Sequence, residues 1–459
     1  MQPDVINHPS SYRDPSGFLF YHNDVLYRQV NKLFKDDFDA FITSGLYDHL
    51  VQKELLVPHQ TIGTNLTGSG DWYQTIQPEK VPFISYPYEW CFEMWKDAAL
   101  TTLQVAKEAL QFGMMLKDAS AYNVQLYKGK MHFIDTLSFE KYNEQEPWIA
   151  YRQFCEHFLA PLALMHYLQQ PLQTLFIPYP NGVPLAVAKK MLPFKSKWNL
   201  HTYLHLHVHA SVANRKGKQQ QSRADFSKQK LSNLLSSLEL AVRSYSFQQP
   251  SGVWSEYYEE ANQREDYVIQ KKQIIKDWVK ELAPKSGIDI GANEGEFSEI
   301  LAEQNIYTIS ADFDHYSINK FYRKIKSNET TNIHPLIIDL VNPSPAIGLN
   351  NEERSSFISR VQTDLVVALA LVHHLAIGKN MPFKSIVQFF KSLGTKLIVE
   401  YIPKEDEKIQ LMLQQKKDVY HWYTQENFLN AFKKIYKIVE AKEVGSYKRT
   451  LYLMQPHEA

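Results

Sequence analysis

The stretch Asp289-Ile-Gly-Ala-Asn-Glu-Gly-Glu-Phe297 decides the fold of the C-terminal half of the chain. It follows a short apolar run and opens an amphipathic pattern, so it is expected to turn from a strand into a helix. Gly291 can adopt the backbone of a tight turn, and Gly295 lets a helix or a ligand approach closely. The backbone N–H groups of such a turn point beyond the end of the strand, where they can bind a ligand.

Short apolar runs and amphipathic stretches alternate around this turn. Five runs are predicted to be buried strands, at residues 286–292, 307–314, 334–340, 364–375 and 395–403. Four stretches are predicted to be helices, at residues 294–304, 315–327, 382–393 and 424–436. This alternation predicts an α/β fold, in which a parallel sheet is covered by helices on both faces.

Two acids end the second and third predicted strands. Asp312 follows the glycine turn by about twenty residues, where a carboxylate can accept both ribose hydroxyls of a nucleoside. Asp339 ends the next strand and is placed to meet the exocyclic amine of an adenine. Ligands of such sheets bind beyond the carboxyl ends of the strands, so Asp289, Asp312 and Asp339 are predicted to border one site.

These residues together resemble the class I S-adenosylmethionine-dependent methyltransferases. The family's first motif, an acid and two glycines, corresponds to Asp289, Gly291 and Gly295. Its ribose-binding acid corresponds to Asp312, with Asp314 as a second candidate. The segment DLVVALALVHHL, residues 364–375, is similar to its fourth strand, and the resemblance extends over residues 250–456.

The resemblance implies a Rossmann-like methyltransferase sheet and S-adenosyl-L-methionine as the cofactor. The cofactor contacts that it implies are Asp289, Gly291, Asn293, Gly295, Asp312, Asp339 and Ala370. A nicotinamide-dependent dehydrogenase is the rival interpretation, but its GxGxxG motif is absent from GIDIGANEG at residues 287–295. A degenerate α/β domain that has lost its ligand is the third alternative.

The sequence also narrows the chemistry of transfer. Cys91 and Cys155 lie away from the site motifs, which disfavours a thiolate nucleophile and excludes a cysteine-ligated radical cluster. The remaining mechanism is in-line transfer of the methyl group to an oxygen, nitrogen or carbon nucleophile. His373 or His374 is either the general base of this step or a structural histidine. Glu400 either orients the acceptor or, with Asp406, caps the following helix.

A second group of residues, Asp118, Asn123 and Asp135, lies in the N-terminal half. Their spacing, with a short hairpin before the last acid, resembles the catalytic loop and metal-binding strand of the protein-kinase and aminoglycoside-phosphotransferase superfamily. The resemblance implies that Asp118 is a base and that Asn123 and Asp135 hold magnesium. The glycine-rich phosphate loop of these kinases is absent, which favours a kinase-like domain that binds without catalysing phosphoryl transfer over an active kinase. In the third alternative, Asp118 and Asn123 are turn and capping residues of a structural loop.

The composition of the chain excludes some classes of protein. The chain has 459 residues, with 50 Lys and Arg against 50 Asp and Glu, so it carries no net charge. This balance argues against a protein whose main task is to grip a nucleic-acid backbone. The chain has only two cysteines, no apolar run of about 18 residues and no signal-peptide pattern, so we expect a cytoplasmic protein without a membrane span. Outside the kinase-like loop, no metal site is predicted.

We therefore expect an α+β kinase-like domain at residues 1–212, a polar linker and connecting helix at 213–250, and a methyltransferase domain at 251–459. The expected activity is methyl transfer to an unknown acceptor, a small molecule, glycan or protein rather than nucleic acid. The N-terminal domain would recognise the substrate or a partner. The alternatives are a bifunctional enzyme that also phosphorylates a small molecule or glycan with ATP and magnesium, and a cofactor-binding scaffold without turnover.

Overall fold

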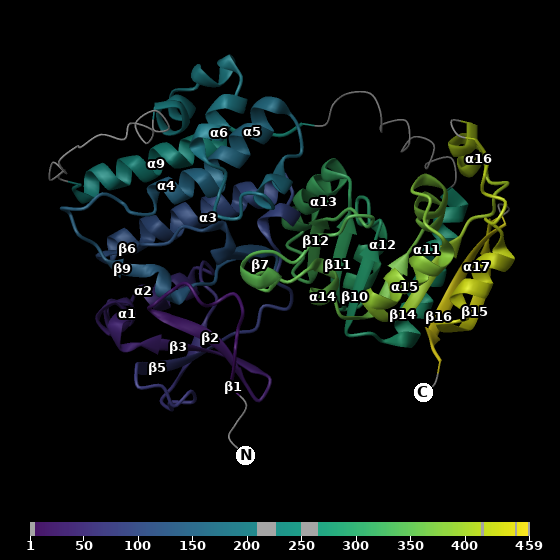
Figure 1. Ribbon diagram of the computed structural model, residues 1–459, viewed down its shortest axis with the longest axis horizontal. Coiled ribbons are helices and arrows are strands. Elements are labelled where there is room, and N and C mark those ends of the chain that lie inside the picture. The colour runs from purple at the N-terminus through teal and green to yellow at the C-terminus, as the bar shows by residue number, and fades with distance from the viewer. Residues whose placement is uncertain (1–4, 209–225, 249–264, 415–416, 446–447, 458–459) are drawn as a thin grey trace. The chain divides into compact units, whose positions relative to one another are not determined.

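The computed structural model describes residues 5–208, 226–248, 265–414, 417–445 and 448–457 (Figure 1). The chain forms two compact units. The first comprises residues 1–248 together with 346–355, and the second comprises residues 249–345 together with 356–459. Of the predicted linker and connecting helix, residues 213–225 and 249–250 lie outside the described residues, while residues 226–248 are described.

The first unit has an α+β fold that begins with a five-stranded antiparallel sheet of order β1-β2-β3-β5-β4. Two antiparallel strand pairs, β6 with β9 and β7 with β8, follow it. The strands are β1 Val5–Asn7, β2 Gly17–His22, β3 Val25–Asn31, β4 His59–Ile62, β5 Trp72–Pro78, β6 Met114–Leu116, β7 Val124–Tyr127, β8 Lys130–Phe133 and β9 Phe139–Lys141.

The helices of the first unit gather around α3, which packs against α9, β6 and β8. They are α1 Lys35–Thr43, α2 Leu46–Gln52, α3 Phe92–Gln111, α4 Tyr151–Phe154, α5 Ala160–Leu168, α6 Leu185–Met191, α7 Leu200–Thr202 and α9 Lys228–Ser244. One face of α3 is apolar and fully buried, from Trp95 to Ala109, which explains its central position. Cys91 and Cys155 are free and buried.

The second unit has the predicted α/β fold, with a sheet of order β12-β11-β10-β13-β14-β16-β15. Its strands are β10 Ser286–Ile290, β11 Tyr307–Asp312, β12 Ile333–Ile337, β13 Thr363–Ala368, β14 Gly394–Tyr401, β15 Tyr436–Val444 and β16 Arg449–Pro456. The first five strands are parallel, as predicted. The strand order reverses between β10 and β13, so this is a Rossmann-like sheet with its switch point beside the glycine turn.

The sheet has two more strands than the sequence patterns predicted. β16 runs antiparallel to both β14 and β15, so the complete sheet is mixed rather than purely parallel. The predicted helix at 424–436 is shorter, since α17 ends at Phe432 and Tyr436 already begins β15. The exposure of the side chains alternates along β15, which is typical of a strand with one exposed face.

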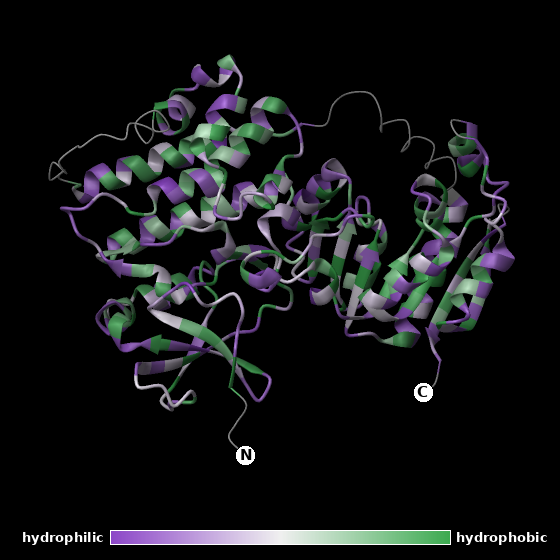
Figure 2. Ribbon diagram, viewed as in Figure 1, coloured by the Kyte–Doolittle hydropathy of each residue, from purple (hydrophilic) through white to green (hydrophobic). Residues whose placement is uncertain are grey.

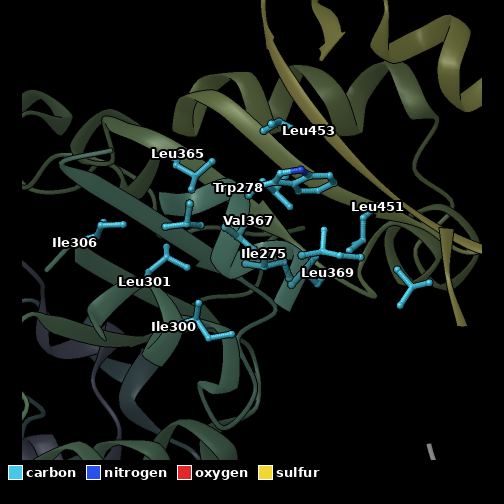
Figure 3. Close-up of a cluster of buried hydrophobic side chains, with 14 of the residues drawn as sticks. Ile275, Trp278, Ile300, Leu301, Ile306, Leu365, Val367, Leu369, Leu451 and Leu453 are labelled. Carbon is cyan, nitrogen blue, oxygen red and sulfur yellow. The ribbon is translucent and has the colours of Figure 1, made fainter. Parts of the chain in front are cut away.

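Helices cover both faces of this sheet and show alternating hydrophilic and hydrophobic bands (Figure 2). They are α11 Glu265–Leu282, α12 Glu296–Glu303, α13 His315–Ser327, α14 Phe357–Arg360, α15 Phe383–Leu393, α16 Glu407–Gln414 and α17 Gln425–Phe432. On one face, Ile275 and Trp278 of α11 pack with Val367 of the central strand β13 (Figure 3). On the other, Phe428 of α17 contacts the ring of Tyr401. No described helix is long and apolar enough to cross a membrane.

The core contact of α11 predicts a stability difference between two isoleucines of the same helix. Ile275 is fully buried, whereas Ile269 is 61% exposed. We expect Ile275→Ala to lower the free energy of unfolding by about 2–5 kcal/mol, because it leaves a cavity under the sheet. Ile269→Ala should change it by less than about 0.5 kcal/mol. Urea unfolding of both variants checks this, and equal losses would contradict the packing of α11.

Candidate functional site

The glycine turn begins where β10 ends, at the carboxyl edge of the parallel strands. Gly291, Asn293 and Gly295 have φ angles of 75°, 51° and 80°, all in the left-handed region that glycine adopts without strain. A Cβ atom on Gly295 would lie 2.0 Å from Cζ of Phe321, so only glycine allows α13 to pack this closely. α12 follows the turn directly, as the sequence predicted.

Asp312, at the end of β11, joins two turns through its carboxylate. Its Oδ2 accepts the N–H of Asn293 in the glycine turn at 2.8 Å, and its Oδ1 accepts the N–H of Asp314 at 2.8 Å. Burial raises the pKa of Asp312, although the two N–H donors oppose that rise. Asp314 instead begins α13, where its side chain accepts the N–H of Tyr316.

Asp289 lies beneath the turn rather than at its surface. Its side chain is almost fully buried, and its Oδ2 accepts a hydrogen bond from Ser298 Oγ of α12 at 2.7 Å. Burial raises the pKa of this carboxyl to about 6. Asp339 differs: it is exposed after β12, and its Oδ1 accepts the N–H of Val341 at 3.0 Å.

The turn after β13 carries the remaining predicted residues of this site. Ala370 has a φ of 48°, and Leu371 Cδ1 lies 3.3 Å from the position that a Cβ of Gly291 would occupy. The rings of His373 and His374 follow, with centroids 4.2 Å apart. Because β10 and β13 are neighbouring parallel strands, their following turns meet at one edge of the sheet.

The two histidines differ in their surroundings. His373 is buried, and its Nδ1 has no hydrogen-bond partner among the described residues. Burial, with His374, Arg449 and Lys271 nearby, lowers the pKa of His373 well below its ordinary value, so the ring is neutral near pH 7. His374 is exposed at this edge, and partial loss of hydration lowers its pKa as well.

Glu400, which the sequence places at the end of the fifth strand, is fully buried within β14. Its carboxylate accepts hydrogen bonds from Tyr267, from Lys271 at 2.6 Å, and from the N–H of Ala370 at 2.8 Å. Asp406, not Glu400, accepts the N–H of Lys408 at the start of α16. Sequence reasoning missed Lys271 and Tyr267, because nothing in the pattern of α11 distinguishes them from other polar positions of that helix.

In the first unit, Asp118, Asn123 and Asp135 lie around the β7–β8 hairpin, as the spacing indicated. Asp135 forms an ion pair with Arg28 of β3, and it accepts hydrogen bonds from the N–H of Leu137 and from Ser138 Oγ. Its oxygens are therefore engaged by protein donors.

The neighbouring acid is engaged as well. Asp118 accepts the N–H of Ser120 and an amide N–H of Gln153, and burial raises its pKa. Asn123 donates to Ser138 Oγ at 3.3 Å. Among the described residues, no group of three or more His, Cys, Asp or Glu side chains is arranged to hold a metal ion. The predicted roles of base and magnesium ligands stay predictions.

Residues 346–355 pack beside this hairpin within the first unit. The guanidinium of Arg354 lies 3.6 Å from the ring centroid of Tyr122, between Asp118 and Asn123 in the sequence. The buried Glu353 accepts a hydrogen bond from Tyr12 and pairs with Arg13, each at 3.0 Å. This segment therefore covers part of the loop that resembles a kinase catalytic loop.

Comparison with known proteins identifies the family. A comparison with models of known families finds no match. Over 465 residues, the chain is 31% identical to nodulation protein NoeA of Rhizobium meliloti (strain 1021), covering 98% of this chain and 96% of that protein. The chain belongs to the family of nodulation protein NoeA.

Solved structures give weaker likenesses. The N-methyltransferase NodS from Bradyrhizobium japonicum WM9 is 13% identical with a TM-score of 0.31, over 42% of this chain and 97% of that one. The bifunctional kinase-methyltransferase WbdD is 18% identical with a TM-score of 0.29, over 43% and 40%. The fold of the second unit is defined here by its own strand order.

The pKa of Asp289 predicts a pH dependence of stability. The carboxyl titrates at about 3.9 in an unfolded chain and at about 6 in the folded protein. The folded state therefore holds the proton more tightly, and stability falls as the pH rises between these values. We expect the free energy of unfolding of the wild type, relative to Asp289→Asn, to fall between about pH 4 and pH 6 and to stay constant above. Urea unfolding across this range measures it, and a constant difference would contradict the buried carboxyl.

Proposed function

We propose that the second unit is a methyltransferase that binds S-adenosyl-L-methionine at the carboxyl edge of β10, β11 and β13. The observation that carries this proposal is the position of Asp312, whose carboxylate stands at the switch point beside the glycine turn. A carboxylate there suits the two ribose hydroxyls of a nucleoside cofactor. Family membership supports a shared activity but does not name it.

The chain's other residues at this edge suit the remaining parts of such a cofactor. The carboxylate of Asp339 is exposed, accepts the N–H of Val341 through Oδ1, and suits an adenine amine. The turn from Gly291 to Gly295 brings backbone close to a ligand because no side chain intervenes at its two glycines. Carboxylates beside the turn suit a cofactor that carries positive charge on its α-ammonium and sulfonium groups.

The cofactor, when bound, supplies an electrophilic methyl group that an acceptor nucleophile attacks in line. The chain has to position the acceptor and, where that atom bears a proton, remove it. His374 is exposed at the site edge and His373 is buried beside it, and lowered pKa values keep both imidazoles neutral and able to accept a proton. We propose His374 as the side chain that meets the acceptor, with His373 packed behind it.

Isothermal titration calorimetry with S-adenosylhomocysteine tests the cofactor assignment. We expect Asp312→Ala to weaken binding by about tenfold to a hundredfold, because a charged hydrogen-bond acceptor is lost. Asp364→Ala is the matched control, since Asp364 also accepts two backbone N–H groups, from Lys285 and Ser286, at the opposite edge of the sheet. Its binding should stay within about twofold of the wild type. Absence of binding to the wild type, or equal weakening in both variants, would contradict the proposal.

The acceptor is proposed to be a small molecule, a glycan or a protein. We expect the whole chain, given S-adenosylmethionine with a labelled methyl group, to label one of these fractions and not RNA. His374→Ala should lower the rate by about a hundredfold if the acceptor atom loses a proton in the step. Label that appears only in RNA would contradict the acceptor class.

A further inference from the structure

A cluster of buried charges lies next to the turn after β13. Lys271 of α11 pairs with Glu400 of β14 at 2.6 Å, and both side chains are at most 5% exposed. Arg449 of β16 pairs with Asp406 through two hydrogen bonds, of 2.8 and 3.0 Å. Tyr267 joins the two pairs, since its hydroxyl donates to Glu400 and accepts from Arg449 at 3.2 Å.

Stability alone is a weak reason for such a cluster. Removing two charges from water costs free energy, and apolar side chains of similar volume often stabilise a core as well or better. The cluster is neutral, with two cations and two anions, so it does not create a field that attracts a charged ligand. A role therefore has to come from what its members contact besides one another.

Glu400 also accepts a hydrogen bond from the backbone of the turn after β13. Its Oε2 accepts the N–H of Ala370 at 2.8 Å. Ala370 has a φ of 48°, a conformation in which its Cβ is crowded, so the turn needs an external hydrogen bond to hold it. The next residue, Leu371, packs beside Gly291 of the glycine turn, and His373 and His374 follow.

We propose that Glu400, held in place by Lys271 and Tyr267, is the positioning residue of the proposed methyl-transfer site. It acts through the N–H of Ala370, which fixes the turn that carries the two histidines and supports the glycine turn. This role rests on the function proposed above. Burial acts to raise the pKa of Glu400, but Lys271, Tyr267 and Arg449 together hold that pKa below its ordinary value, so the carboxylate stays charged.

Two double variants of the whole chain separate positioning from stability. Lys271→Met with Glu400→Leu leaves no lone buried charge, and it removes the acceptor for the N–H of Ala370. Lys271→Met with Glu400→Gln is its matched partner, because the amide oxygen still accepts that N–H. Asp406→Asn is the control for the cluster, since Asp406 pairs with Arg449 on the neighbouring strand β16.

Hydrogen exchange of the Ala370 amide and the affinity for S-adenosylhomocysteine are measured in each variant. We expect exchange about tenfold faster, and binding about threefold to tenfold weaker, in the leucine variant than in the glutamine variant. Asp406→Asn should lower the melting temperature without changing either readout. Equal exchange in the leucine and glutamine variants would overturn the proposal. If the wild type binds no S-adenosylhomocysteine, the proposed function fails, while the exchange of Ala370 still decides the positioning role.

Discussion

The carboxylate of Asp312 is the contact on which the proposed site depends. One oxygen accepts an N–H of the glycine turn after β10, and the other accepts an N–H of the turn after β11. Two turns that are distant in sequence are thereby fixed against each other by one side chain. Burying the carboxylate costs free energy, and the same burial raises the pKa of Asp312. The two N–H donors offset part of that cost.

The third turn, after β13, is fixed in a similar way by a side chain of the neighbouring strand β14. Glu400 accepts the N–H of Ala370, and Lys271 compensates its charge. Asp312 and Glu400 are both carboxylates that accept backbone N–H groups. In the strand order, β11 with Asp312 and β14 with Glu400 lie on either side of the central strands β10 and β13. Preorganisation of this kind suits a transfer reaction in which the protein's main contribution is to place two reactants in line.

Much of the second unit could be predicted from the sequence because its signals are local. The glycine turn and the five parallel strands are predicted by short apolar runs and by the glycine and polar residues that bound them. Asp312 lies at the end of the second of these strands, as its spacing from the glycine turn predicted. β15 and β16 were missed. Polar and apolar residues do not alternate strictly in β15, which has a bulge between Ile438 and Glu440, and its start continues the preceding helical pattern. β16 is one short apolar run without a following helix.

Contacts between residues that are distant in the sequence could not be predicted from sequence patterns. The pairing of Lys271 with Glu400 spans 129 positions, and that of Arg28 with Asp135 spans 107. The assignment of residues 346–355 to the first unit likewise depends on contacts such as Arg354 with Tyr122, which no periodicity encodes. In the kinase-like loop, the spacing located the hairpin correctly, but it did not show that Arg28 and Ser138 already engage the last acid.

Hydrogen–deuterium exchange of the whole chain with and without S-adenosylhomocysteine tests the central claim, that this edge of the sheet is a cofactor site. The account predicts slower exchange in peptides covering residues 286–297, 307–314 and 363–375, where the three turns meet. Peptides covering residues 114–141 should exchange at the same rate in both samples. Unchanged exchange in the three turns at saturating ligand, or protection confined to residues 114–141, would contradict it.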